Sequence, residues 1–215
     1  MTITRAIGAG CNSIILLIVR GLALSRIHPN MLTLIGLLIN VYAAVLLARG
    51  EFLYGGLVVI GAGLFDMVDG RVARHTNQVT RFGAFFDSVL DRYSDLGLLM
   101  GLLVYYANID RFFYVVLTAV VMTGSVMVSY TRSRAENLIP TCKVGFAERP
   151  ERVVLLIIGA LFDRMAPALW ALAVLSNLTV IHRMLYTFQQ AKALEEAQLR
   201  PAGGPRESAA AARKG

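Results

Sequence analysis

The sequence predicts an all-α membrane protein with six transmembrane helices and an N-terminal amphipathic helix that lies at the membrane interface. Of its 215 residues, 56% are hydrophobic and only 16% are charged, and the mean hydropathy is +0.61. Soluble domains carry about 25% charged residues. Two uncharged runs of eighteen residues, Met31–Ala48 and Phe112–Ser129, are each long enough to cross a bilayer. We therefore expect the net charge of +7 to orient the chain in a membrane rather than to bind nucleic acid.

Apolar runs and the breaks between them place the six helices near residues 31–48, 52–75, 83–107, 112–129, 153–162 and 165–181. The apolar run at 153–162 is short, so we expect this helix to gain length from 147–152. The second helix is expected to continue past Asp66 and Asp69, because Val68 and Val72 maintain the helical pattern and no proline interrupts it. The segment 1–28 has apolar stretches that are too short and too charged to span a bilayer, so we expect it to lie at the interface.

The distribution of basic residues predicts the orientation in the membrane. Arg49, Arg111 and Arg164 are the only basic residues in the three turns expected outside the cell. By the positive-inside rule, both termini and the acidic segments then lie on the cytoplasmic side. We divide the chain into an interfacial segment at 1–28, a six-helix catalytic domain at 29–190 and a basic, disordered cytoplasmic tail at 191–215. Glycine-rich helix faces favour a homodimer.

Four aspartates interrupt apolar helices: Asp66 and Asp69 in the second, and Asp87 and Asp91 in the third. Each aspartate near mid-helix costs about 2.5–3.5 kcal/mol on membrane insertion, so the group requires compensation. At 100° per residue each pair lies on one helix face, and a short turn between the helices brings the two faces together. Grouped carboxylates repel one another unless cations bind them, and oxygen ligands suit Mg²⁺ or Mn²⁺. A divalent metal site with two ions is the direct interpretation.

Eight positions form the pattern Asp66-x-x-Asp69-Gly70-x-x-Ala73-Arg74 and, after eight further residues, Gly83-x-x-x-Asp87-x-x-x-Asp91. This pattern resembles the signature of the CDP-alcohol phosphotransferases, and it fills every defining position. The resemblance implies that CDP-diacylglycerol or a related CDP-lipid donates its phosphatidyl group to an alcohol hydroxyl, releasing CMP. It also implies that two divalent ions bind at the aspartates.

The resemblance assigns roles to individual residues. Asp66, Asp69 and Asp87 are implied metal ligands, and Asp91 is both a ligand and the base that removes the hydroxyl proton. The residues implied to contact the CDP-lipid are Asn30, Thr33, Asp69, Gly70, Ala73, Arg74 and Gly83. The small residues would allow close approach of the nucleotide, and Arg74 would hold its phosphates by charge. Capping of the first helix is the alternative role for Asn30.

Five cations gather between the fourth and fifth helices, within residues 132–152. An acceptor that itself carries a phosphate would need such a cluster, because arginines offer paired hydrogen bonds to phosphate oxygens. The candidate phosphate ligands are Arg132, Lys143, Arg149 and Arg152. Together with the third helix they resemble the family branch that uses inositol 1-phosphate. Glycerol 3-phosphate is the alternative acceptor, and topology or contact with anionic lipid is the alternative role for the charges.

Two hypotheses of other classes compete with an enzyme. Carboxylates inside a membrane also mark ion or proton pathways, but the aspartate pattern has no second copy in the sequence, although transporters commonly contain repeated halves. A membrane scaffold with purely ion-paired aspartates is the third possibility. The small residues beside the acids favour a bound substrate over such a scaffold.

Overall fold

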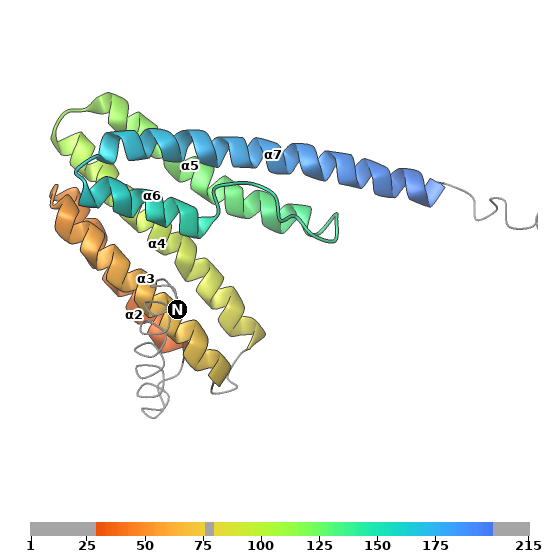
Figure 1. Ribbon diagram of the computed structural model, residues 1–215, viewed down its shortest axis with the longest axis horizontal. Helices are drawn as coiled ribbons and strands as arrows, with labels where there is room; N and C mark the ends of the chain where they lie inside the picture. The colour runs from red at the N-terminus through yellow and green to blue at the C-terminus, as the bar shows by residue number, and fades with distance from the viewer. Residues whose placement is uncertain (1–28, 76–79, 200–215) are drawn as a thin grey trace, which may run out of the picture.

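The computed structural model describes residues 29–75 and 80–199, with the side chains of 29, 67–75 and 198–199 outside the description. All regular elements in these two ranges are helices, so the predicted all-α class is confirmed (Figure 1). They are α2 (Pro29–Ala48), α3 (Phe52–His75), α4 (Arg81–Asn108), α5 (Phe112–Ala135), α6 (Arg149–Leu161) and α7 (Met165–Leu199). The interfacial helix expected in 1–28 lies outside the described residues.

Three tight turns join the helices in pairs at one end of the bundle, on the left in Figure 1. Each turn contains a residue in the left-handed conformation: Gly50 between α2 and α3, Asp110 between α4 and α5, and Asp163 between α6 and α7. At Gly50 a side chain would also collide with a ring, because a Cβ would lie 2.7 Å from Tyr105 Cε2. The three turns are those that the sequence predicts outside the cell.

The helices pack around one apolar core. The helix α2 packs on α3 and α4, α5 packs on α4 and α7, and α6 packs on α3 and α7. Leu47, Leu102 and Leu169 are fully buried where these helices meet. Gly101 brings α4 against the backbone of α2, because a Cβ at this position would lie 2.3 Å from the carbonyl oxygen of Ala44. The helices α3 and α4 are therefore held in place by α2, and α3 also by α6.

The outer surface of the bundle is apolar, as expected for contact with lipid. Leu38, Tyr54 and Phe112 are 60%, 62% and 77% exposed. Three of the described helices are long and apolar enough to cross a membrane, over Asn30–Ala48, Phe112–Ala135 and Met165–Ala197. The chain is an integral membrane protein. The apolar part of α3 and the thirteen residues of α6 are shorter than these three spans.

Three helices extend beyond the apolar runs that predict them. The helix α5 continues to Ala135, and α6 already begins at Arg149, so the connection between them is shorter than the predicted loop at 132–152. Arg132 consequently lies in the last turn of α5. The helix α7 continues through 191–199, a part of the segment that the sequence assigns to a tail, and its C-terminal part projects beyond the other helices (Figure 1). Residues 200–215 of that segment lie outside the described residues.

Candidate metal centre

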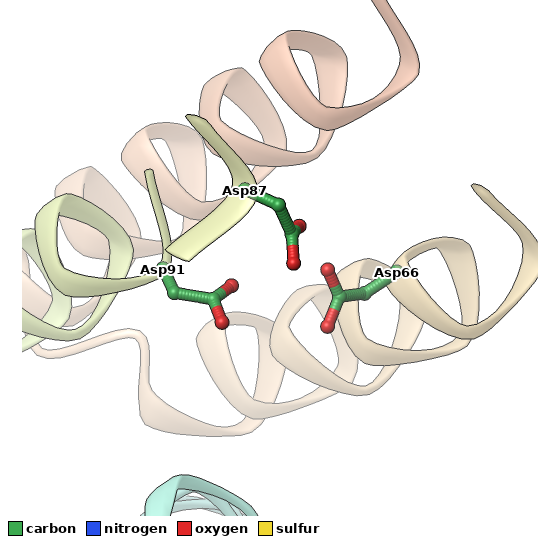
Figure 2. A group of neighbouring side chains, drawn as sticks. All are labelled: Asp66, Asp87 and Asp91. Carbon is green, nitrogen blue, oxygen red and sulfur yellow. The ribbon is translucent and has the colours of Figure 1, made fainter. Parts of the chain in front are cut away.

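Three carboxylates meet between α3 and α4, at the end of the bundle away from the three tight turns. Oxygen atoms of Asp66, Asp87 and Asp91 all lie within 4.8 Å of one another, and each residue is partly buried. Figure 2 shows the three side chains pointing toward a common point. This all-oxygen donor set, with three negative charges in a small volume, fits a hard divalent cation such as Mg²⁺ or Mn²⁺.

Helix geometry explains why these three side chains meet. Asp87 and Asp91 are four residues apart in α4, so they lie on one face of that helix. The helix starts at Arg81, about three turns before Asp91, and the side chain of the preceding Thr80 accepts a hydrogen bond of 2.9 Å from the backbone nitrogen of Gly83. Asp66 comes from α3, which continues as a helix past this position as the sequence predicts. Asp69, Gly70, Ala73 and Arg74 belong to the same helix, but their side chains lie outside the description.

An arginine from α6 joins the acidic cluster. Arg149 Nη1 lies 2.9 Å from Asp66 Oδ2 and 3.0 Å from Asp91 Oδ1. Its Nε donates a hydrogen bond of 3.3 Å to Asp95 Oδ1. A single guanidinium therefore connects two members of the cluster to a further aspartate one turn along α4.

Asp95 is the centre of a second, more buried ion pair. Arg152 Nη2 lies 2.6 Å from Asp95 Oδ2, and only 6% of the Arg152 side chain and 10% of the Asp95 side chain are exposed. Arg152 Nη1 also donates to the carbonyl oxygen of Ala147, at 2.9 Å. The predicted acceptor ligands Arg149 and Arg152 thus lie beside the acidic cluster, in the first turn of α6.

The other two predicted acceptor ligands lie elsewhere. Arg132 pairs with Glu136 at 3.1 Å and with Glu148 at 3.2 Å, and Lys143 is exposed. Arg183, which the sequence pattern does not single out, is 1% exposed and pairs with the same Glu148 at 3.1 Å. Its place just after the long apolar run at 165–181 was the signal for it. The shared Glu148 brings Arg132 and Arg183 together from α5 and α7.

The predicted nucleotide contacts of α2 lie close to the acids. Thr33 lines a small polar recess together with Asp66, Asp91 and Arg149. A Cβ on Gly83 would lie 3.4 Å from Asn30 Oδ1, so Asn30 is adjacent to the start of α4. The recess also contains two buried polar residues, Ser94 and Asn40, which are 5% and 8% exposed, and Asn40 was not among the residues that the sequence pattern singles out.

A longer groove of about 390 Å³ leads away from the acids between α3 and α6. Asp66, Asp95 and Arg149 line its polar end. Its remaining wall is mostly apolar and includes Val59, Leu64, Val153, Val154 and Ile157. Leu64 and Val154 are about half exposed, so the groove reaches the apolar outer surface of the bundle. The charged site and an apolar groove that opens to the outer surface of the bundle are therefore continuous.

Comparisons with known proteins agree with this arrangement. The sequence model of the family described as CDP-alcohol phosphatidyltransferase matches residues 26–188. The archaetidylinositol phosphate synthase of Pyrococcus horikoshii is 39% identical over 165 residues, which cover 76% of this chain and 85% of that protein.

Two crystal structures of the phosphatidylinositol phosphate synthase of Mycobacterium tuberculosis are also similar. The one with CDP-DAG bound has a TM-score of 0.77 and 33% sequence identity, over 82% of this chain and 94% of that one. The one in complex with manganese and citrate has a TM-score of 0.74 and 34% identity, over 80% and 87% of the two chains.

Proposed function

The chain belongs to the CDP-alcohol phosphatidyltransferase family, and from this premise we propose that it makes a phosphatidylinositol phosphate or its archaeal counterpart. The donor is CDP-diacylglycerol or a related CDP-lipid, the acceptor is the hydroxyl of inositol 1-phosphate, and CMP is released. The observation that carries the proposal is the meeting of Asp66, Asp87 and Asp91 with Arg149 and Arg152 around one site. Acids for metal ions and arginines for an acceptor phosphate are both present.

Asp66, Asp87 and Asp91, together with Asp69, would hold two divalent ions, either Mg²⁺ or Mn²⁺. The similar structure in complex with manganese supports this assignment. When bound, such ions neutralise the diphosphate of the donor and stabilise charge during phosphoryl transfer.

Asp91 is the base of the proposed reaction. It lies one helical turn beyond Asp87 and also faces Arg149 from α6. A carboxylate at this position can contact the cluster and also accept the proton of an incoming hydroxyl at one of its oxygens.

The donor would bind across α2, α3 and α4. The nucleotide would be bordered by Asn30 and Thr33 of α2 and by Gly83 of α4. The remaining proposed contacts come from α3: Asp69, Gly70, Ala73 and Arg74. The closeness of Asn30 to Gly83 and of Thr33 to Asp66 supports this arrangement. The apolar groove between α3 and α6 would take a lipid chain, because its polar end contains Asp66 and its wall is open to the outer surface.

The acceptor phosphate would bind on the side of α6. Arg149 and Arg152 are within ion-pair distance of Asp91 or Asp95, so a phosphate held by them would place its alcohol near the base. Arg132 and Lys143 would contribute from the α5–α6 connection. Glycerol 3-phosphate is the alternative acceptor, since it presents the same charge.

We further propose that all six described helices cross the membrane within a homodimer, with an interfacial helix in 1–28. Both termini and the site would be cytoplasmic. The support is the arrangement of the three tight turns at the end opposite the acids, together with the scarcity of basic residues in these turns.

The proposal is tested by the product. Purified protein is incubated with CDP-diacylglycerol and Mn²⁺ or Mg²⁺. Separate reactions each also contain one candidate acceptor: inositol 1-phosphate, glycerol 3-phosphate or serine. Of the three acceptors, we expect only inositol 1-phosphate to give CMP release and a lipid product with the mass of phosphatidylinositol phosphate. A product only with glycerol 3-phosphate would identify the alternative acceptor. If neither inositol 1-phosphate nor glycerol 3-phosphate supports CMP release, the proposed acceptor class is refuted.

A further inference from the structure

Arg149 shares its guanidinium between two kinds of carboxylate. Its Nη1 lies between Asp66 Oδ2 and Asp91 Oδ1, at 2.9 and 3.0 Å, and both of these residues belong to the acidic cluster. Its Nε is 3.3 Å from Asp95, which is not a member of that cluster. The side chain therefore has one end among the proposed metal ligands and an independent attachment outside them.

A divalent cation and Arg149 would compete at the cluster. Both are positive, and both would use oxygens of Asp66 and Asp91, so the presence of one weakens the binding of the other. Asp95 does not take part in this competition. It is also fixed by Arg152, through a 2.6 Å contact between side chains that are at most 10% exposed. Arg149 can therefore leave the cluster without losing its attachment to α4.

We propose, on the basis of the function proposed above, that Arg149 is an exchangeable counter-ion which couples metal loading to acceptor binding. When divalent ions bind at Asp66 and Asp91, Nη1 of Arg149 leaves these carboxylates while Nε stays on Asp95. The released Nη1 then donates to the phosphate of the acceptor. Arg149 thus binds the acceptor phosphate, and the acceptor site is complete only after the metal site is filled.

The exchange is tested by Mn²⁺ binding in the absence of substrates, measured on the purified full chain by the spin-resonance signal of free Mn²⁺. Removing a competing charge tightens binding, so Arg149→Gln should lower the Kd for Mn²⁺ by about tenfold or more, equivalent to about 1.4 kcal/mol. Arg152→Gln is the matched control, because it removes the same charge from α6 but touches neither Asp66 nor Asp91. We expect it to change the Kd by less than about threefold, as a charge effect at longer range.

Equal tightening in both variants would overturn the exchange, since net charge alone would then explain it. An unchanged or weaker Mn²⁺ affinity in Arg149→Gln would overturn it as well. Arg149→Lys is a second variant for the case in which the glutamine variant does not fold. Its single ammonium cannot reproduce the fork that reaches Asp66, Asp91 and Asp95 together, so its Kd should also fall below that of the wild type.

The coupling is tested by repeating the titration with saturating inositol 1-phosphate. Because linkage is reciprocal, the acceptor should tighten Mn²⁺ binding to the wild type, and this effect should vanish in Arg149→Gln. Persistence of the effect in the variant would overturn the role of Arg149 in coupling. The underlying function is tested separately, because a wild-type chain that neither binds Mn²⁺ nor releases CMP refutes that function. If the wild type binds Mn²⁺ and releases CMP, and Arg149→Gln has the same Kd for Mn²⁺ as the wild type, only the exchange is refuted.

Discussion

Asp95→Asn removes the negative partner of the most buried ion pair at the site. Arg152 is 6% exposed and would keep its charge, with only the carbonyl of Ala147 and the amide oxygen of the new asparagine as acceptors. Breaking a buried pair by removing one partner costs about 3–5 kcal/mol. The asparagine retains one acceptor, so we expect the lower end, about 3 kcal/mol. In a chain of this size that corresponds to a fall in Tm of about 6–12 °C.

The measurement is thermal unfolding of the purified protein in detergent, with Glu136→Gln as the control. That substitution breaks a pair with Arg132 in which both side chains are 38% exposed. An exposed pair contributes about 0–1 kcal/mol, so the control should shift Tm by less than about 4 °C. The double variant Asp95→Asn, Arg152→Gln should be more stable than Asp95→Asn alone, because it removes the uncompensated charge. A Tm of Asp95→Asn within the range of the control, or a double variant that is less stable still, would refute this account.

Three further outcomes are expected. Chelation of divalent ions should abolish CMP release, and Asp66→Asn or Asp87→Asn should reduce it severely, as measured by CMP formation; full activity in excess chelator would contradict the metal site. Asp91→Asn should lower kcat by about 10²–10⁴-fold, the range for a lost general base, while binding of CDP-diacylglycerol in a filtration assay is largely retained; a near wild-type rate would exclude Asp91 as the base. Gly101→Leu should lower stability by at least about 1–3 kcal/mol in the same thermal assay, because a side chain collides with the backbone of α2, and an unchanged Tm would show that the helices can separate there.

Local pattern was sufficient for most of the helices and for the acidic cluster. The continuation of α3 past Asp66 was predicted from the absence of a proline, and α3 does run to His75. The spacing of Asp87 and Asp91 in one helix was enough to expect them on a single face. The approach of Asp66 to both followed from a short connection between two antiparallel helices, which is a local feature of the chain.

Helix ends near the basic residues were harder to predict, because charge was taken as a sign of a loop. The helix α5 continues to Ala135, where Arg132 and Arg134 lie in its last turn and interact favourably with the helix dipole. The helix α6 begins at Arg149, within the stretch 147–152 from which the sequence predicts that it gains length, and Pro150 is well tolerated in its first turn. Beyond residue 181, α7 continues through a stretch rich in Ala, Gln, Glu and Leu, all good helix formers.

The contacts of Arg149 could not be predicted from local pattern at all. Its partner Asp66 is 83 residues away in the sequence, and the two meet only because α6 packs on α3. Arg183 reaches Glu148 in the same way, from a different helix and across 35 residues. Pairings of this kind depend on the tertiary arrangement of helices, for which a single sequence carries no periodic signal.

The apolar groove between α3 and α6 determines which concentration of the lipid donor governs the reaction rate. A lipid that enters from the side travels in two dimensions and need not leave its bilayer or micelle. Its effective concentration is then its mole fraction among the surrounding amphiphiles, not its amount per litre of solution. Adding detergent at a constant amount of CDP-diacylglycerol should therefore slow the reaction by surface dilution. The apparent KM for a water-soluble acceptor should not change when detergent is added.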